Sequence, residues 1–420
     1  MIAVSAPPGD DRASYLREVG ALLWPAPASV TLTRPGRVAK PGPAGTHDLM
    51  VLPGLRRPRL IVPSGPRAAA AAVRRYGEPA SVRARLATRT LSVTLGSGLG
   101  RVLLRDRLRV HVPDGADTIE AYLAGVLGQP VAISLHLGAR RANRKPVLQV
   151  LTPAGETIAF VKIGVNPLTA ELVRAERDAL ARLAAAGLRT IGVPDVLSYG
   201  TWRGLEVLVL GALPVWQRRV PLAAGQLGSA MTEVARAGGT RTGTLGASEY
   251  WRQLARRLDA AGQGTEHDEL RAAVGRLGAV AGQQTLSFGA WHGDWTPWNM
   301  ASTEDGLLVW DWERFTTGVP AGFDALHYWL QAQVVGGKDD PAQAAADCVA
   351  QAAGLLAPLG VPPDQAPATA LAYLADLSVR YLADKQEQAG ARLGAPRRWL
   401  IPALAAGTAR LPGQGHDEKE

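Results

Sequence analysis

His292-Gly293-Asp294-Trp295-Thr296-Pro297-Trp298-Asn299 is the stretch that says most about the fold and chemistry of this chain. Asp311 lies twelve residues after Asn299 and ends the apolar, strand-like run Leu307 to Trp310. Phosphoryl transfer needs a carboxylate that orients and deprotonates the attacking hydroxyl, and oxygen ligands that hold Mg²⁺ against the phosphates. Asp294 can supply the carboxylate, and Asn299 and Asp311 the oxygen ligands. A loop followed by a strand can bring all three to one point.

These residues resemble two motifs of the aminoglycoside phosphotransferase and choline kinase family, which is related to the protein kinases. The catalytic loop of that family reads His-Gly-Asp-x-x-x-x-Asn, as residues 292–299 do, and its second motif reads Asp-Trp-Glu or similar, as residues 311–313 do. The resemblance implies a bilobal, protein-kinase-like fold with Asp294 as catalytic base. It also implies that Asn299 and Asp311 bind Mg²⁺ and that a nucleoside triphosphate, ATP or GTP, donates the phosphoryl group.

A kinase-like site also requires a lysine on a sheet strand and a glutamate on the following helix. Lys162 lies in the β-rich run 158–163 and is one of only six lysines among 46 basic residues. On the next predicted helix, Glu176 shares a stripe with apolar side chains at helical spacing. Because a carboxylate within an apolar face is costly without a partner, we predict that Glu176 pairs with Lys162 at the nucleotide site. A solvated Glu176, with Glu171 as the partner, is the alternative.

The phosphate-binding loop departs from the protein-kinase pattern Gly-x-Gly-x-x-Gly. Residues 137–145, between two predicted strands, read Leu-Gly-Ala-Arg-Arg-Ala-Asn-Arg-Lys and contain a single glycine, Gly138. Members of the family it resembles often have a looser loop, so Gly138 is the candidate cofactor-binding residue here. The basic side chains of the loop could contact phosphates or could simply be solvated in a hairpin turn.

Six of the eleven tryptophans fall between residues 291 and 329, around the motif. Strand alternation places Trp310 and Trp312 on one side, which suits two core positions. Trp295 and Trp298 lie inside the predicted catalytic loop, where their rings could pack or could face a sugar or a cationic substrate.

Two further polar residues near the motif are expected to be structural. Asp324, in Gly-Phe-Asp-Ala-Leu, has the pattern of a helix N-cap, and in the family it resembles a matching aspartate steadies the catalytic loop. His292 is expected to hold that loop by hydrogen bonds rather than to exchange protons.

A chain of 420 residues suggests two or three domains. We predict an α+β protein with a basic N-terminal α+β extension over residues 1–115, an antiparallel-sheet N-lobe over 116–212, a helical C-lobe over 213–412 and a tail over 413–420. Strands are expected at 49–52, 59–62, 102–112, 131–136, 147–152, 157–163 and 205–210. Helices are expected at 14–23, 67–76, 81–91, 118–127 and 169–186. After residue 222 helical patterns dominate, apart from the strand at 307–310.

The net charge of +9 is concentrated near the N-terminus. Residues 1–112 hold 18 basic and 6 acidic side chains, a net of +12, which leaves −3 for the rest. A solvated basic surface is the simpler interpretation, and an anionic partner the other. Nucleic acid is not the expected partner, because no recognition motif accompanies the charge. Cys348 is the single cysteine, so neither an intrachain disulfide nor a thiolate metal cluster can form. With no signal peptide and no apolar run long enough for a membrane span, the cytoplasm is the expected location.

The sequence thus predicts a small-molecule kinase that transfers the γ-phosphoryl group to the hydroxyl of a sugar, an amino alcohol or an antibiotic. Residues 338–420 hold 10 acidic and 8 basic side chains, which disfavours a polycationic acceptor. The alternative is a catalytically silent kinase-like protein that binds nucleotide or acts as a scaffold. The oligomeric state is left open.

Overall fold

The computed structural model describes residues 12–34, 43–75, 82–336 and 340–411. The chain forms two compact units, each described here by itself. Unit 1 comprises Met1–Arg140, Arg144–Val173 and Asp195–Ala212. Unit 2 comprises Arg141–Asn143, Arg174–Pro194 and Leu213–Glu420. The predicted tail at 413–420 lies outside the described residues.

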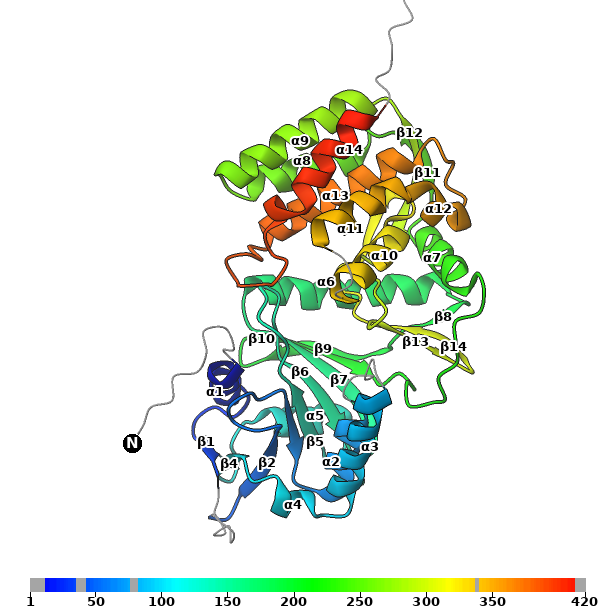
Figure 1. Ribbon diagram of the computed structural model, residues 1–420. Coiled ribbons are helices and arrows are strands. Elements are labelled where there is room, and N and C mark those ends of the chain that lie inside the picture. Colours follow the sequence, from blue (N-terminus) through cyan, green and yellow to red (C-terminus); the bar gives the residue numbers. More distant parts are fainter. Residues whose placement is uncertain (1–11, 35–42, 76–81, 337–339, 412–420) are drawn as a thin grey trace, which may run out of the picture. The chain divides into compact units, whose positions relative to one another are not determined.

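Unit 1 is built on one nine-stranded sheet with the order β1-β4-β2-β3-β5-β6-β7-β10-β9 (Figure 1). Every neighbouring pair in it is antiparallel. The strands are β1 (Ser29–Thr33), β2 (Thr46–Leu52), β3 (Leu60–Pro63), β4 (Arg107–His111), β5 (Ala132–His136), β6 (Val147–Leu151), β7 (Thr157–Gly164), β9 (Val196–Trp202) and β10 (Leu205–Gly211). The helices are α1 (Arg12–Leu23), α2 (Pro66–Arg75), α3 (Val82–Gly96), α4 (Gly100–Leu103) and α5 (Ile119–Leu127).

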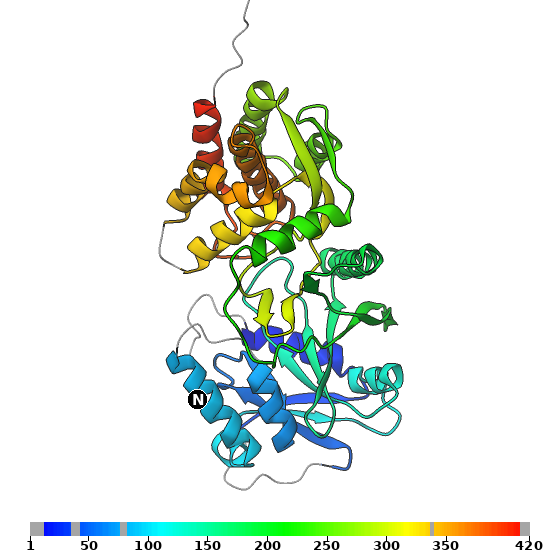
Figure 2. The ribbon, with the colours of Figure 1, turned by 90° about the vertical axis from the view of Figure 1, so that its right-hand side faces the viewer.

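Helices cover both faces of this sheet at β2 and β3, where the second half of β2 and the whole of β3 are buried on both sides. Leu49 and Val51 of β2 pack on the side of α1 and α5. Met50 and Leu52 alternate to the other side and pack with α2 and α3. Figure 2 shows α2 and α3 lying side by side. The sheet core is therefore two-layered, one hydrophobic cluster on each face.

Strands from both sides of residue 115 belong to this one sheet. Leu60 of β3 pairs with His136 of β5, which joins β1–β4 to β5, β6, β7, β10 and β9. Residues of the predicted N-terminal domain, 1–115, thus share one sheet with the lobe that follows. That they form a domain of their own stays a prediction. The strand predicted at 102–112 is wrong in its first part: Gly100–Leu103 form α4, with Val102 and Leu103 exposed, and β4 starts at Arg107.

The long helix α6 (Pro167–Ala186) starts in unit 1 and continues in unit 2. Its start is fixed by a reciprocal pair of side chains, in which Asn166 Oδ1 accepts from the Thr169 N–H at 2.9 Å and Thr169 Oγ1 accepts from the Asn166 N–H at 3.0 Å. These bonds satisfy N–H groups that have no partner within the helix. The helix predicted at 169–186 is confirmed, two residues longer at its start.

Unit 2 is mainly helical and carries two three-stranded sheets, β11-β12-β15 and β13-β14-β8. Its core lies around α13, whose residues from Ala368 to Val379 are all buried. The helices are α7 (Gln226–Ala237), α8 (Glu249–Ala260), α9 (Thr265–Ala281), α10 (Phe323–Gly336), α11 (Pro341–Ala350), α12 (Ala352–Leu356), α13 (Ala366–Ala383) and α14 (Leu400–Arg410), with 3₁₀ turns η1 (Ala357–Leu359) and η2 (Pro396–Arg398). The strands are β8 (Ile191–Gly192), β11 (Arg241–Thr244), β12 (Thr285–Trp291), β13 (Met300–Thr303), β14 (Gly306–Val309) and β15 (Thr316–Pro320).

The prediction of a single strand after residue 222 is wrong, because β11, β12, β13 and β15 accompany β14. The strand predicted at 307–310 is β14, which ends one residue earlier, at Val309. The strands β1, β8 and β9 were not predicted either. The sequence does carry a signal for β12, because apolar Leu286 and Phe288 alternate with polar Ser287 as in a strand. In the structure Leu286 and Phe288 are buried and Ser287 is exposed. In the described residues, no helix is both long and apolar enough to span a bilayer.

The α+β class expected from the sequence is confirmed, and an antiparallel-sheet unit followed by a mostly helical unit is the division expected for a protein-kinase-like fold. The hydrophobic patterns of short sequence segments were thus enough to predict that the chain contains both strands and helices.

Candidate active site

The motif residues gather at the open end of the hairpin β13–β14. Met300 pairs with Val309, and one step beyond, the Trp310 N–H donates to the Asn299 carbonyl at 3.0 Å. Asn299 immediately precedes β13, and Asp311 follows β14 by two residues. The antiparallel pairing therefore explains how residues twelve apart in sequence emerge at one end of one hairpin.

Asp294 is held through both of its carboxylate oxygens. Asn299 Nδ2 donates to Oδ2 at 3.0 Å, and His327 Nε2 lies 3.1 Å from Oδ1. The side chain remains 35% exposed, so a reactant can still reach it. Burial raises the pKa of the Asp294 carboxyl, but the hydrogen bond from His327 acts against it, and the pKa lies below its usual value. Asp294 is thus an oriented carboxylate in its ionised form.

His292 holds the loop by hydrogen bonds, as expected from the sequence. Its Nδ1 accepts from the Asp294 N–H at 3.1 Å, which assigns the proton to Nε2, and Nε2 donates to the Trp310 carbonyl at 3.0 Å. Burial lowers the pKa of His292 to about 4. A neutral histidine with both nitrogens engaged connects the catalytic loop to the end of β14.

Asp324 also stabilises the loop, although the expected N-cap is wrong. α10 already starts at Phe323, and the Asp324 carboxylate accepts from the backbone N–H groups of His292 (2.7 Å) and Gly293 (3.2 Å). Burial raises the pKa of Asp324 to about 7, against the two N–H donors, which lower it. The helix pattern was correct, but the side chain serves a distant loop rather than its own helix.

Gly293 occupies a position that only glycine fits. Its φ is +84°, and a Cβ built there would lie 2.2 Å from the Arg314 carbonyl oxygen. The same glycine carbonyl accepts a hydrogen bond from Arg380, on α13. Arg314 itself forms a partly buried ion pair with Asp384. The backbone ahead of Asp294 is therefore fixed on several sides.

Three carboxylates gather beside the hairpin, and their ligand atoms all lie within 4.8 Å of one another: Glu176, Asp311 and Glu313. Asp311 has a φ of +73°, a left-handed conformation that few residues other than glycine adopt. Glu176 Oε1 accepts from the Trp312 N–H at 3.2 Å, and Asn143 Nδ2 donates to Glu313 at 3.3 Å. Glu313, which the sequence argument left without a role, thus belongs to the candidate site.

The tryptophans divide by exposure. Trp295 and Trp312 are fully buried and pack on the His292 ring, with centroids 5.8 Å and 4.3 Å away. Trp298 is 44% exposed, and Trp310 lies outside β14 and is only half-buried. Of the two loop tryptophans, Trp295 is therefore a packing residue, and Trp298 keeps a ring available to solvent.

Lys162 and Gly138 belong to unit 1. Lys162 lies in β7 between Leu208 of β10 and Val147 of β6, and is 8% exposed. Gly138 follows buried Leu137, and a Cβ added to it would meet nothing within 4 Å, so sterics do not demand a glycine there. The roles of both residues, and the predicted pairing of Lys162 with Glu176, remain predictions.

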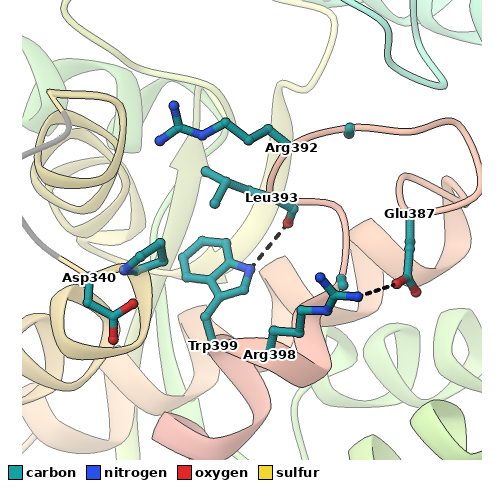
Figure 3. Close-up of a pocket in the computed structure, with 9 residues that line it drawn as sticks. Asp340, Glu387, Arg392, Leu393, Arg398 and Trp399 are labelled. Carbon is teal, nitrogen blue, oxygen red and sulfur yellow. Dashed lines mark hydrogen bonds and ion pairs between the residues drawn. The ribbon is translucent and has the colours of Figure 1, made fainter. Parts of the chain in front are cut away.

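Sequence analysis missed two residues that contact the loop directly, His327 and Arg380. A signal for the first was present, since Asp324 and His327 are three apart on one helix and face the same side. Arg380 had no such local signal. A hollow of about 240 Å³ also lies in unit 2 and contains none of the predicted site residues (Figure 3). It is lined in part by Asp340, Glu387, Arg392, Leu393, Arg398 and Trp399.

Residues 143–360, just over half of the chain, match the model of a family described as the phosphotransferase enzyme family. The chain belongs to this phosphotransferase family. The matched span includes the catalytic loop, the Asp-Trp-Glu motif, Lys162 and Glu176. The family resemblance and the class of activity that were predicted, a phosphotransferase enzyme, are confirmed.

Several solved structures are similar to this phosphotransferase. A thermostable mutant of aminoglycoside phosphotransferase APH(4)-Ia, in complex with ADP and hygromycin B, is 12% identical, with 69% of this chain and 98% of that chain covered and a TM-score of 0.46. Aminoglycoside phosphotransferase APH(3'')-Id from Streptomyces rimosus is 17% identical, with 56% and 90% covered and a TM-score of 0.36. Choline kinase LicA from Streptococcus pneumoniae is 14% identical, with 69% and 98% covered and a TM-score of 0.42. No curated protein matches.

Proposed function

We propose that this phosphotransferase moves the γ-phosphoryl group of ATP or GTP to a hydroxyl group of a small molecule, with Asp294 as the base. The observation that carries the proposal is the state of the Asp294 carboxylate. It is ionised and hydrogen-bonded to Asn299 and His327, yet a third of its side chain is exposed. A base must reach the proton that it abstracts and must not already hold one.

The reaction then needs little covalent help from the protein. The acceptor hydroxyl donates a hydrogen bond to Asp294, which orients the oxygen toward the γ-phosphorus and takes the proton as the new O–P bond forms and the bond to the nucleoside diphosphate breaks. The rate of such a transfer depends on how accurately the base and the reacting groups are placed. The hydrogen bonds that fix the catalytic loop to α10 and α13 therefore support catalysis by keeping Asp294 in position.

The donor set beside the hairpin fits Mg²⁺. The ion prefers hard oxygen ligands, and the amide oxygen of Asn299 and the carboxylate of Asp311 are of that kind. Carboxylates within 4.8 Å of one another favour a bound cation, which supports a site at Asp311 with Glu176 and Glu313 nearby. When bound, Mg²⁺ supplies neutralisation of the charge on the phosphates. We assign Asn299 and Asp311 as its ligands.

Lys162 is proposed as the residue of unit 1 that contacts the phosphates of the nucleotide. It is a buried lysine in an interior strand of the sheet, where a strand lysine of a kinase-like fold would lie. Gly138 and the loop around it are proposed to lie along the nucleotide. Arg144 of that loop is less suited to bind phosphate, since its guanidinium lies 3.4 Å from the centre of the Tyr15 ring.

A panel of acceptors tests this function. The protein would be incubated with Mg²⁺, ATP or GTP, and sugars, amino alcohols and antibiotics, and mass spectrometry would detect the gain of one phosphoryl group. We expect a product with the parent protein and none with Asp294→Ala. Asp305→Ala, which removes an exposed carboxylate at the turn of the same hairpin, is the matched control and should remain active. A parent that binds nucleotide but phosphorylates none of these classes would favour the catalytically silent alternative.

A further inference from the structure

His327 is a buried histidine directed at the one exposed carboxylate of the catalytic loop. It lies on α10, its side chain is 1% exposed, and its Nε2 is 3.1 Å from Asp294 Oδ1. Its Nδ1 is 3.0 Å from the hydroxyl oxygen of Tyr373, on α13. A line of three polar groups therefore runs from the helical core of unit 2 to Asp294.

The hydrogen bonds determine which nitrogen of His327 carries the proton. An ionised carboxylate can only accept, so Nε2 must donate to Asp294. Nδ1 is then a bare acceptor, and the Tyr373 hydroxyl donates to it. Burial lowers the pKa of His327, in keeping with a neutral ring. With Nε2 already protonated toward Asp294, the histidine cannot take the proton of the acceptor itself.

The ring has little freedom to turn. It stands edge-on to Trp291 and to Tyr373, with centroids 6.2 Å and 5.9 Å away. Trp291 and Tyr373 are themselves buried. Asp324, one turn earlier on α10, holds the N–H groups of His292 and Gly293. One face of α10 thus fixes both the backbone of the loop and its carboxylate.

We propose that His327 is a positioning residue for phosphoryl transfer: Tyr373 locks it as the Nε2–H tautomer, and in that form it sets the orientation of the Asp294 carboxylate. This inference rests on the proposed function only for its effect on rate. The tautomer and the bond to Asp294 are properties of the protein without any substrate.

Nitrogen NMR of ¹⁵N-histidine-labelled protein tests the tautomer directly. His327→Gln identifies the His327 signals by their loss. At neutral pH we expect a protonated Nε2 and a bare Nδ1, an Nε2–H resonance that shifts in Asp294→Ala, and an Nδ1 resonance that shifts in Tyr373→Phe. A protonated Nδ1 with a bare Nε2, or an imidazolium, would overturn the proposal, and so would an Nε2–H signal that is indifferent to Asp294.

Kinetics test the consequence, with the panel acceptor that the parent phosphorylates fastest. His327→Leu removes the donor, whereas Gln can donate to Asp294 and accept from Tyr373. We expect His327→Leu to lower kcat about tenfold or more with the nucleotide Kd within about twofold of the parent, and His327→Gln to recover most of the loss. Equal kcat values for folded His327→Leu and the parent would refute the positioning role.

Two controls separate the possible failures. If His327→Leu does not fold, as judged by circular dichroism and melting, Tyr373→Phe replaces it. A drop in kcat of about threefold or more without a change in nucleotide Kd is then expected, and parental kcat refutes the role. If Asp294→Ala transfers phosphate as well as the parent, the proposed base is wrong, and the NMR result still decides the tautomer by itself.

Discussion

The side-chain amide of Asn299 donates two hydrogen bonds to Asp294, one to its carbonyl at 2.9 Å and one to Oδ2 at 3.0 Å. Because Nδ2 is used in this way, the amide oxygen of Asn299 points away from Asp294. One residue can thus orient the proposed base with its nitrogen and offer its oxygen to a cation. The two roles assigned to the motif are joined in a single side chain.

Replacing Asn299 should therefore reduce both functions together. We expect Asn299→Ala to lower kcat by about tenfold to a hundredfold and to raise the Mg²⁺ concentration needed for half-maximal activity. Asn299→Asp should keep a metal ligand but place a second carboxylate beside Asp294, so its kcat should fall while its Mg²⁺ requirement stays closer to that of the parent. Steady-state kinetics over a Mg²⁺ titration check this. Equal Mg²⁺ dependence in Asn299→Ala and the parent would contradict the ligand assignment.

Asp311 should control metal affinity without controlling the fold. Asn tolerates the left-handed conformation that this position requires, so Asp311→Asn removes charge at little backbone cost. We expect about a tenfold or larger rise in the half-maximal Mg²⁺ concentration, with an unchanged melting temperature. Asp305→Asn, in the same hairpin, serves as control and should leave the titration unchanged. A chelator should abolish transfer in all three proteins.

Gly293 should be intolerant of any side chain. Alanine there would combine a φ of +84° with a 2.2 Å approach to the Arg314 carbonyl, so unfolding should become easier by at least about 2 kcal/mol or the loop should shift and activity fall. Gly275→Ala, within α9 and with nothing within 4 Å of the new Cβ, is the matched control. It should be neutral or slightly stabilising. Urea unfolding of both variants makes the comparison, and equal stabilities with full activity would be inconsistent with this geometry.

The buried His292 should make stability depend on pH in acid. Its pKa falls from 6.5 to about 4 on folding, so in this window the unfolded chain binds more protons than the folded one. The contribution of His292 to the free energy of unfolding is fully present above about pH 6.5 and is lost as the pH falls toward 4. The loss amounts to about 3 kcal/mol at most. His292→Gln should flatten the slope of unfolding free energy over that range. An unchanged slope in His292→Gln would contradict the prediction.

Local patterns in the sequence were enough for the motif, for most strands of unit 1 and for α6, because these features depend on neighbours in sequence. The contacts that finish the site were not predictable in this way. Asp324 reaches His292 across 32 residues, and His327 reaches Asp294 across 33. The spacing of Asp324 and His327 on one helix face shows that they point the same way, but not which residues they contact. The strand β12, which leads into the loop, was overlooked among the surrounding helical patterns. Its burial arises from packing against α-helices that are distant in sequence.

The most direct test of the central claim compares Asp294→Asn with the parent protein. This replacement keeps the size of the side chain and removes its ability to take a proton. Nucleotide affinity would be measured by titration calorimetry and transfer by the rate of acceptor phosphorylation. The account predicts an unchanged nucleotide Kd, within about threefold, and a fall in kcat of about a thousandfold or more. A variant that transfers phosphate at the parental rate would contradict it.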